Sequence, residues 1–426
     1  MQLSVCKKNF KILFFVEKSE HIFYNYIGDI MKEKIIFHID VNNAYLSWTA
    51  VDLLKNGYGK DIRKYPSVIG GDEDKRHGIV LAKSPVAKKR GVVSAETIYS
   101  ARKKCSNLLV FPPNYKLYSK NSRMLFEYLA TLTPDLMPFS IDEAFLDMSN
   151  MDYIYKDLVK LAYEIKEKIK NRFGFTVNVG IGNNCLCAKM ASDFEKPDKV
   201  HTLFSYEVQD KMWPLPVRDL LYVGKSSVKK LQDLGIITIG DLANVDVSVL
   251  KPYFKNMAAD LINRANGIDD MEYRNKTAKN RSVSISRTLP KDIINKKNLY
   301  EVLLEETDEV GRNLRKQNKY AKTVAVTFRN SDFFDYSHQT TLSEGINSTM
   351  DIYNEVVKIF EVAWRHDYIR NIGIRLDNLC DKAFVQMDLF SKNKKAENSS
   401  VQEVLDKINN RFGKSCVTIA SLKKKN

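Results

Sequence analysis

The sequence predicts an α+β protein with several domains. Its 426 residues exceed what one compact hydrophobic core usually holds. Between residues 35 and 204, apolar runs typical of strands alternate with helical periodicities. Residues 205–267 then have a mainly helical pattern, and residues 283–379 read as strand, helix, strand, strand, helix and strand. That last order is typical of a separate β-α-β-β-α-β domain.

The composition indicates a polyanionic partner. The net charge is +15 and the pI is about 9.2. A positive field of this size suits DNA, RNA or an anionic membrane surface, although a merely basic cytosolic protein would carry it too. No apolar run reaches the length that spans a bilayer. Because the six cysteines are scattered and complete no zinc site, we expect reduced thiols in a cytoplasmic protein.

The first thirty residues are expected to lie outside the folded domains. Their apolar run at residues 11–16 is short and soon meets Glu17 and Lys18. A secretory signal would carry a longer apolar region and a small-residue cleavage site. Met31 stands directly before the first strand, so we expect either a natural start at Met31 or a poorly ordered extension over residues 1–30.

The first strand is predicted at residues 35–40, a nearly continuous apolar run that ends in Asp40. Such runs are typical of buried strands, and the acid would stand at the exit of the strand. Asn42 and Asn43 favour a turn and a helix start, which would direct backbone amides toward the same place. A helix N-terminus beside cations is a site for a triphosphate. Tyr45 would face this space, or else pack as a core aromatic.

A small mixed region is predicted next. Strands are expected at residues 67–71 and 78–82, followed by a basic helix over residues 83–92 that ends at Gly91. The charges of this helix, Lys88 among them, would form a solvated face, or one or two would point inward and neutralise phosphates.

The most unusual stretch is residues 140–147, where Asp142 and Glu143 stand side by side in an apolar run. In a strand their side chains would point to opposite faces, so one would be buried at considerable cost unless a positive group meets it. A solvated turn at a hairpin tip would remove this cost. Together with Asp40, however, the pair would form an oxygen-rich site of the kind that Mg²⁺ prefers. Two such ions are the machinery of polymerase-type phosphoryl transfer.

Further helices and a strand surround this stretch. Helices are predicted at residues 116–132, from Asp152 to Arg172 and at residues 186–194, with a strand at residues 175–181 before the last of them. In the helix from Asp152, apolar residues recur at helical spacing, namely Ile154, Leu158, Leu161, Ile165 and Ile169.

Residues 222–236 predict a glycine-containing hairpin between short helices. Gly224, Lys225 and Ser226 would present amides and a positive charge to a backbone phosphate, which fits sequence-independent duplex binding. A simple helical hairpin is the alternative. Residues 273–281 are polar and basic without periodicity, and we expect a linker that lies along DNA.

A short apolar peptide follows the last predicted strand in an otherwise polar tail. Apolar side chains in a flexible segment are costly unless the groove of a partner takes them, although the tail could instead pack on its own domain. The peptide consists of Gln386, Met387, Asp388, Leu389 and Phe390. Residues 401–412 are expected to form one more short helix.

From about residue 34 to residue 390, the chain resembles the Y-family of translesion DNA polymerases. The most specific piece is Ser140-Ile141-Asp142-Glu143-Ala144. The supporting pieces are Ile39-Asp40 with Tyr45, Gly180-Ile181-Gly182-Asn183, Ala188-Lys189-Met190-Ala191-Ser192 and Lys196-Pro197. The resemblance implies a right-hand polymerase with palm, fingers, helical thumb and a β-α-β-β-α-β little finger. The implied boundaries are 31–43 and 113–204 for the palm, 44–112 for the fingers, 205–272 for the thumb, 273–281 for the linker, 282–380 for the little finger and 381–426 for a tail with a clamp-binding peptide at 386–390.

The resemblance also implies roles for individual residues. Asp40, Asp142 and Glu143, with the carbonyl of Val41, would hold two Mg²⁺ ions, for which Mn²⁺ can substitute. Tyr45 is similar to the steric gate that excludes the 2′-hydroxyl of ribonucleotides. The implied triphosphate contacts are Asn43, Ala44, Tyr45, Lys88 and Lys196. The implied DNA contacts are Gly224, Lys225, Ser226 and Arg281, and the implied sliding-clamp contacts are Gln386, Met387, Leu389 and Phe390.

The chain departs from the family pattern at several positions. Pro85 stands where many relatives carry a tyrosine over the phosphates, and Ala82 stands where a threonine is found nearby. Tyr222 replaces a common glycine of the hairpin and Cys185 replaces a frequent lysine, so fewer contacts to phosphates and DNA are expected there. Asn42 replaces an acid that is not a metal ligand.

The implied activity is template-directed addition of deoxynucleotides to a primer 3′ end. A monomer would work at low fidelity and low processivity, and the sliding clamp would improve the latter. A non-catalytic DNA-binding accessory of the same fold and a nucleotidyl cyclase are the rival classes. The intact acids Asp40, Asp142 and Glu143 argue against the first. The hairpin, the basic linker and the clamp-like peptide have no purpose in the second.

Overall fold

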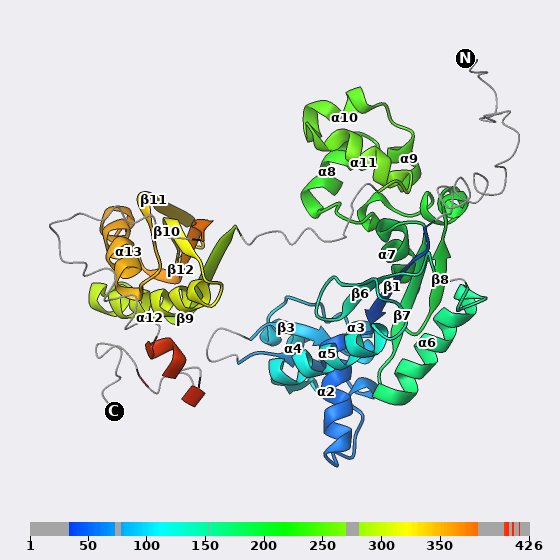
Figure 1. Ribbon diagram of the computed structural model, residues 1–426, viewed down its shortest axis with the longest axis horizontal. Helices are drawn as coiled ribbons and strands as arrows, with labels where there is room; N and C mark the ends of the chain where they lie inside the picture. Colours follow the sequence, from blue (N-terminus) through cyan, green and yellow to red (C-terminus); the bar gives the residue numbers. More distant parts are fainter. Residues whose placement is uncertain are drawn as a thin grey trace, which may run out of the picture. The chain divides into compact units, whose positions relative to one another are not determined.

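The computed structural model describes residues 34–72, 78–151, 153–269, 281–381, 404–408, 411–412 and 417. The expected extension over residues 1–30, most of the predicted linker and the peptide at residues 386–390 lie outside this part of the chain. The chain divides into two compact units, which are described separately (Figure 1). The first consists of Met1–Gly70, Val80–Glu96 and Ser100–Asn275, and the second of Gly71–Ile79, Thr97–Tyr99 and Lys276–Asn426.

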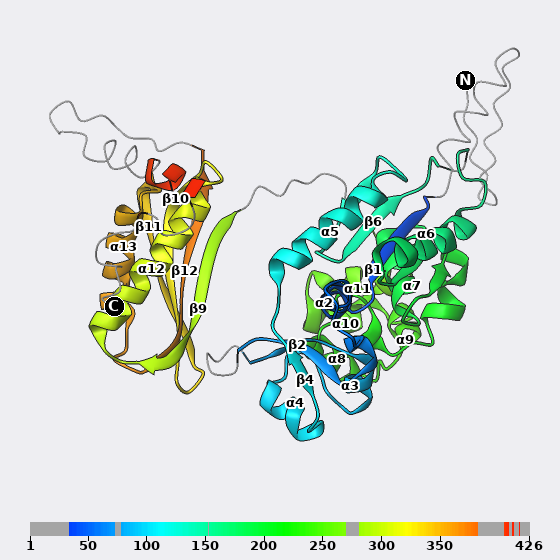
Figure 2. The ribbon, with the colours of Figure 1, turned by 90° about the horizontal axis from the view of Figure 1, so that it is seen from below.

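The first unit is built on a five-stranded sheet of order β5-β6-β1-β7-β8 (Figures 1 and 2). Its strands are β1 Ile36–Val41, β5 Leu136–Pro138, β6 Glu143–Asp147, β7 Val177–Gly182 and β8 Val200–Leu203. The central strand β1 is antiparallel to both of its neighbours, β6 and β7. Every residue of β1 is buried, which is the reason for its continuous apolar run and confirms the predicted strand.

Helices cover both faces of this sheet. One face shares a hydrophobic core with α2 Ala44–Lys55, α5 Tyr115–Leu129 and α6 Leu158–Phe173. Phe37 and Ile39 of β1 point into that core. The alternate positions of β1 belong to the other face, where Ile36 packs with Ala188 of α7 Cys185–Asp193. Asp40 shares this period-two face, so the first acid stands on the side of the sheet that α7 covers.

Helix α6 is shorter than predicted. It begins at Leu158 rather than near Asp152, because Asp157 caps it by accepting a hydrogen bond from the amide of Lys160. Ile154, which fits the apolar spacing of the helix, lies in a turn and is 55% exposed. The apolar spacing therefore predicted a helix that includes Ile154, whereas the cap at Asp157 leaves Ile154 outside the helix.

The region predicted as small and mixed contains a three-stranded sheet of order β3-β2-β4. Its strands are β2 Ser67–Gly70, β3 Val80–Lys83 and β4 Leu109–Phe111, of which β4 was not predicted. The helical segments there are η1 Ile62–Lys64, α3 Pro85–Lys89 and α4 Ile98–Lys104. The basic helix predicted over residues 83–92 is thus only the five-residue α3, which Ser84 caps by accepting a hydrogen bond from the Ala87 amide.

The predicted helical character of residues 205–267 is confirmed. Short turns η2 Ser205–Glu207, η3 Val208–Met212 and η4 Val217–Asp219 precede α8 Lys225–Asp233, α9 Ile239–Ala243, α10 Val247–Phe254 and α11 Met257–Ala265. Their core residues, such as Leu231, Leu250 and Leu261, form one cluster with Leu186 and Met190 of α7. These helices are thereby packed on the back of the helix that faces Asp40.

The second unit contains the predicted β-α-β-β-α-β order. Its elements are β9 Ser282–Ile293, α12 Lys296–Arg315, β10 Tyr320–Asn330, β11 Asp335–Ile346, α13 Thr349–Ala363 and β12 Ile369–Cys380. The strands form an antiparallel sheet of order β11-β10-β12-β9. Apolar residues of α12 and α13, including Leu303 and Phe360, share one core with the sheet, and Figure 2 shows both helices along one of its faces.

Candidate active site

Strand pairing brings the first and third acids together. Asp40 lies directly opposite Glu143 in the antiparallel ladder of β1 and β6. Directly opposite residues project to the same face with their Cβ atoms about 5 Å apart. The amide of Val41 donates a 3.1 Å hydrogen bond to the carbonyl of Asp142, which places the second acid at the same strand ends. Three acids from distant parts of the chain thus stand at one edge of the sheet.

The hairpin between β5 and β6 combines both interpretations of the acidic pair. Asp142 lies in the bend before β6, whereas Glu143 is the first residue of the strand. Ser140 Oγ donates a 2.6 Å hydrogen bond to Asp142 Oδ1 and fixes the bend. Alternation alone therefore does not decide the orientation of the pair, because only one member belongs to the strand.

Two lysines meet the acids at close range. Lys196 Nζ donates to Asp40 Oδ2 at 2.5 Å, and Lys189 Nζ of α7 donates to Glu143 Oε2 at 2.9 Å. Buried His38 stands 3.8 Å from Glu143 Oε2 through Nε2, and its Nδ1 lies 2.8 Å from Ser192 Oγ. The roles of Lys189 and His38 were not predicted, because their partners are far away in the sequence.

The surroundings drive the pKa values of the two facing acids apart. Burial raises the pKa of Asp40 to about 6 against the effect of Lys196, and the charges of Glu143 and Asp142 raise it further. Burial alone would also raise the pKa of Glu143, but His38 and Lys189 outweigh it and lower that pKa to about 2. The three acids therefore share one electrostatic field.

The donor set suits a hard divalent cation. Asp40, Asp142, Glu143 and the carbonyl of Val41 offer only oxygen atoms, as Mg²⁺ requires. Within the described ranges, no group of three or more acidic, histidine or cysteine side chains is already arranged around a metal position. Asp40 and Glu143 are each paired with a lysine ammonium group in this structure, Lys196 and Lys189 respectively. The oxygen donors of these residues fit a divalent cation.

Helix α2 begins beside the acids. Its N-cap residue Asn43 has a left-handed backbone with φ 56°, and its side chain donates to the carbonyl of Lys83 instead of capping the helix. The first-turn amides, at Ala44 and Tyr45, are therefore not capped by the asparagine side chain. The ring of half-buried Tyr45 stacks on Tyr118 of α5 at a centroid distance of 4.5 Å.

The basic residues near this helix start come from β3 and α3. Lys88 is exposed on α3. Burial and the nearby charge of Lys88 both lower the pKa of Lys83. The Asn43 side chain donates to the Lys83 carbonyl, so Lys83 connects the start of α2 to this basic region. Lys83 is therefore a further candidate for a triphosphate contact, which the sequence did not single out.

A buried pair of amides fixes the segment that carries Lys196. Asn42 Nδ2 donates to Asn178 Oδ1 at 3.0 Å, and Asn42 Oδ1 accepts from the Asp198 amide. Asn178 Nδ2 donates to the carbonyls of Ser192 and Glu195, on either side of the turn that follows α7. Asn42, at a departure from the family pattern, thus has a structural role in positioning the loop.

The predicted DNA contacts occupy two different units. Gly224, Lys225 and Ser226 are exposed at the start of α8. Tyr222 just before them has φ 69°, a left-handed conformation that favours glycine, and Arg264 lies over its ring. Arg281 is exposed before β9 in the second unit. The four predicted clamp contacts lie outside the described residues.

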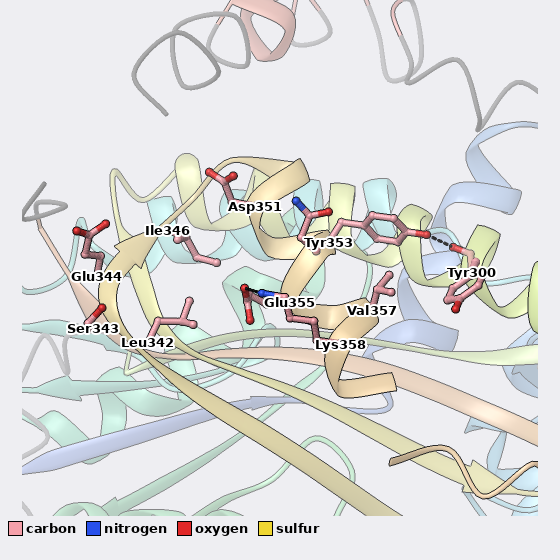
Figure 3. A pocket seen from close by; sticks show the side chains of 11 residues that line it. Tyr300, Leu342, Ser343, Glu344, Ile346, Asp351, Tyr353, Glu355, Val357 and Lys358 are labelled. Carbon is pink, nitrogen blue, oxygen red and sulfur yellow. Dashed lines mark hydrogen bonds and ion pairs between the residues drawn. The ribbon is translucent and has the colours of Figure 1, made fainter. Parts of the chain in front are cut away.

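A cavity of about 640 Å³ in the second unit is a different feature (Figure 3). It lies between β11, α13 and the start of α12, and its lining includes Tyr300, Leu342, Asp351 and Val357. None of the predicted site residues lines it, so it is not the candidate active site. None of the helices in the described ranges combines the length and apolar character that crossing a membrane requires.

Comparison with known proteins places the chain among the nucleic-acid polymerases. Models of three protein families match the chain: the impB/mucB/samB family at residues 39–193, the IMS family HHH motif at residues 207–236, and the impB/mucB/samB family C-terminal domain at residues 280–389. The chain belongs to the impB/mucB/samB family of Y-family DNA polymerases, and it is a DNA-directed DNA polymerase of translesion synthesis.

Individual relatives agree with this assignment. The DNA polymerase IV of Clostridium acetobutylicum is 46% identical over 384 residues, which cover 90% of this chain and 97% of the relative. That of Acetivibrio thermocellus is 34% identical over 393 residues, with 89% and 95% coverage. A solved Y-family polymerase chimera of Dbh and Dpo4 has a TM-score of 0.70 at 22% identity, covering 82% of this chain and all of that one. The fold is therefore that of a Y-family polymerase with a C-terminal little finger.

Proposed function

We propose that the chain extends a primer by two-metal nucleotidyl transfer, with Asp40, Asp142, Glu143 and the carbonyl of Val41 as ligands of two Mg²⁺ ions that Mn²⁺ can replace. The observation that supports this most directly is the ladder pairing of Asp40 with Glu143, with Asp142 at the same strand ends. When bound, the ions would lower the pKa of the primer hydroxyl and stabilise charge on the transferred phosphate and the leaving pyrophosphate.

The chain itself supplies the positioning of the nucleotide. The start of α2, with Asn43, Ala44 and Tyr45, directs helix amides at the triphosphate, and Lys88 and Lys196 neutralise it. Lys196 pairs with Asp40 in this structure, and in the nucleotide complex it would bind phosphate oxygens in place of that carboxylate. The Tyr45 ring lies under the sugar and rejects the 2′-hydroxyl.

Template and primer would be held without sequence preference. Gly224, Lys225 and Ser226 at the start of α8 and the exposed Arg281 before β9 contact backbone phosphates. In this proposal residues 31–43 and 113–204 form the palm, 44–112 the fingers, 205–272 the thumb, 273–281 a linker and 282–380 the little finger. Copying is of low fidelity and proceeds in the cytoplasm.

A sliding clamp would compensate for low processivity. The peptide Gln386, Met387, Leu389 and Phe390 has the apolar composition that a clamp groove takes, and it stands shortly after the little finger in the sequence. The polymerase itself works as a monomer.

The decisive variant is Asp142→Ala. It removes one carboxylate from the metal site and leaves the basic surface intact, so primer extension should fall by at least about 1,000-fold while the affinity for primed DNA stays within about twofold. Asp147→Ala at the other end of β6 is the matched control and should keep its activity, because it pairs opposite Ile36 and not near Asp40. Full extension by Asp142→Ala would refute the two-metal assignment.

A further inference from the structure

We infer that Tyr118 determines sugar specificity by holding the ring of Tyr45 in place from behind. This inference rests on the proposed role of Tyr45 as the gate against ribonucleotides. Tyr118 belongs to α5, which lies far from Tyr45 in the sequence, and no motif in the sequence pointed to it.

The ring of Tyr45 is supported on one face by a side chain that cannot yield. Tyr118 is completely buried, and the two rings are stacked at a centroid distance of 4.5 Å and an angle of 13°. Behind Tyr118 lies the main core of the first unit, including Trp48 at a centroid distance of 6.0 Å. Because protein cores are close-packed, Tyr118 has no space into which to retreat.

A hydrogen-bond chain locks Tyr118 to the residue that it supports. Thr49 Oγ1 donates a 2.8 Å hydrogen bond to the carbonyl of Tyr45. A threonine hydroxyl has one proton, so at 3.1 Å from the Tyr118 hydroxyl it must be the acceptor, and Tyr118 the donor. Thr49 thereby connects the tip of the supporting ring to the backbone of the gate.

The edge of the gate is supported less firmly. Tyr115 meets the Tyr45 ring edge to face at 6.3 Å and 84°, but Tyr115 is 57% exposed. An exposed side chain can move away from an incoming group, whereas a buried one cannot without opening a cavity. The stacked Tyr118 is therefore the residue that fixes how far the gate ring can give way.

Rigidity is what a steric gate needs. A 2′-hydroxyl adds one oxygen atom to the sugar, and a ring that shifted by about an atomic radius would admit it. A ring stacked against a fixed partner can shift only if that partner moves as well. Discrimination should therefore depend on the filled space behind Tyr45 as well as on Tyr45 itself.

The test compares single-nucleotide incorporation of deoxy- and ribonucleotides by the full chain. Tyr118→Leu should lower the ratio of the two kcat/KM values by about tenfold or more, through a rise for the ribonucleotide, with the deoxynucleotide value within about threefold of wild type. Tyr118→Phe keeps the stack and should restore most of the ratio. Thr49→Val keeps the Tyr118 ring but removes the hydroxyl that links Tyr118 to the Tyr45 carbonyl, and should give an intermediate ratio.

Tyr128→Leu on the same helix is the matched control, because Tyr128 packs on Phe173 and not on Tyr45. It should lower the melting temperature without changing the ratio. An unchanged ratio in Tyr118→Leu, with a collapsed ratio in Tyr45→Ala, overturns the role of Tyr118 and leaves the gate intact. An unchanged ratio in Tyr45→Ala overturns the gate and this inference together. If Tyr118→Leu does not fold, Tyr118→Met, whose longer and more flexible side chain can adapt to the space but cannot stack as a ring does, gives the same decision.

Discussion

The two lysines that meet the acids differ in their freedom to move. The side chain of Lys189 on α7 is 11% exposed and donates to Glu143, whereas the side chain of Lys196 is 36% exposed and bridges Asp40 and Asp193. A buried ammonium that left its carboxylate would strand two charges, so Lys189 is suited to a fixed counter-charge. The more exposed Lys196 can reorient at little cost, which suits a group that follows an arriving phosphate.

Replacing Lys196 should therefore weaken nucleotide binding before it affects chemistry. We expect Lys196→Met to lower kcat/KM for deoxynucleotide incorporation by about 10- to 100-fold, mainly through KM, because a charge that meets the triphosphate is lost. Lys199→Met is the control, since Lys199 pairs 3.3 Å away with exposed Glu195. Pre-steady-state incorporation at varied nucleotide concentration measures both effects, and an unchanged KM for Lys196→Met would rule out the contact.

At the scale of elements, the site depends on how closely α7 approaches the sheet. A Cβ at Gly180 of β7 would lie 1.9 Å from the carbonyl oxygen of Ala188, and one at Gly182 would lie 2.7 Å from the Ala188 amide. Only glycine permits this contact. The close packing brings Lys189 and Ser192 within reach of Glu143 and His38, so two glycines control the geometry around one of the acids.

Gly180→Ala should force α7 away from the sheet and destabilise the first unit by about 3 kcal/mol or more. Gly59→Ala is the control, because its Cβ would meet nothing within 4 Å and its φ is not positive. Thermal unfolding of both variants decides the matter. Equal melting temperatures would mean that α7 does not lie against β7 as closely as described.

An ion pair between α12 and β9 predicts that the stability of the second unit depends on pH. Glu306 is fully buried, and Arg287 Nε stands 2.7 Å from its Oε1. The contact is an ion pair without hydrogen-bond alignment, since neither carboxylate oxygen has a hydrogen-bond partner in the described part of the chain. Burial raises the pKa of Glu306 to about 7, Arg287 opposes it, and Glu309 and Glu305 raise it further.

A carboxyl group with a raised pKa binds its proton more tightly in the folded state. Below the ordinary pKa of 4.5, Glu306 is protonated in both the folded and the unfolded state, and its burial costs no charge desolvation. As the pH rises toward 7, the unfolded state loses this proton first, so the free energy of unfolding falls, and the loss is complete above pH 7. The second unit should thus lose on the order of 2–3 kcal/mol of stability between pH 4.5 and pH 8 from this group. Glu306→Gln should remove that loss, as measured by hydrogen exchange of α12 at the two pH values. Glu361→Gln, at an exposed pair with Lys296, should not, and a loss that persists in Glu306→Gln would contradict the assignment.

The sequence predicted correctly those helices and strands that are determined by a pattern within their own segment. The apolar run before Asp40 identified β1, and the order of elements in the second unit followed from periodicity. The helix predicted from Asp152 was too long at its start. Ile154 fits the apolar spacing of the helix, but this spacing does not show that Asp157 caps the helix and that α6 begins only at Leu158. His38 and Tyr118 could not be assigned roles, since His38 meets Ser192 across 154 residues and Tyr118 meets Thr49 across 69. Such contacts are created by tertiary packing, which leaves no mark within either segment alone.

At the scale of the whole molecule, the large positive charge of the chain favours DNA binding. Because such binding depends on charge, salt weakens it. A net charge of +15 gives fast, sequence-independent association. Phosphate contacts of this kind lose affinity steeply as ionic strength rises. Under the proposed function, a second tether that does not depend on charge would favour processive synthesis at physiological salt, and the apolar peptide at residues 386–390 is the proposed tether.

Replacing Leu389 and Phe390 together with alanine should abolish stimulation by the sliding clamp and leave basal primer extension within about twofold, because the apolar anchors are removed far from the acids in the sequence. Lys392→Ala with Lys394→Ala is the matched control, which removes charge beside the peptide and keeps its apolar residues. Stimulation is measured as product length per binding event on primed circular DNA, with and without clamp, at low and at physiological salt. The difference between wild type and the Leu389 and Phe390 variant should grow with salt, because the charge-based contacts then contribute less. Equal stimulation of all three proteins would show that the clamp contacts another part of the chain.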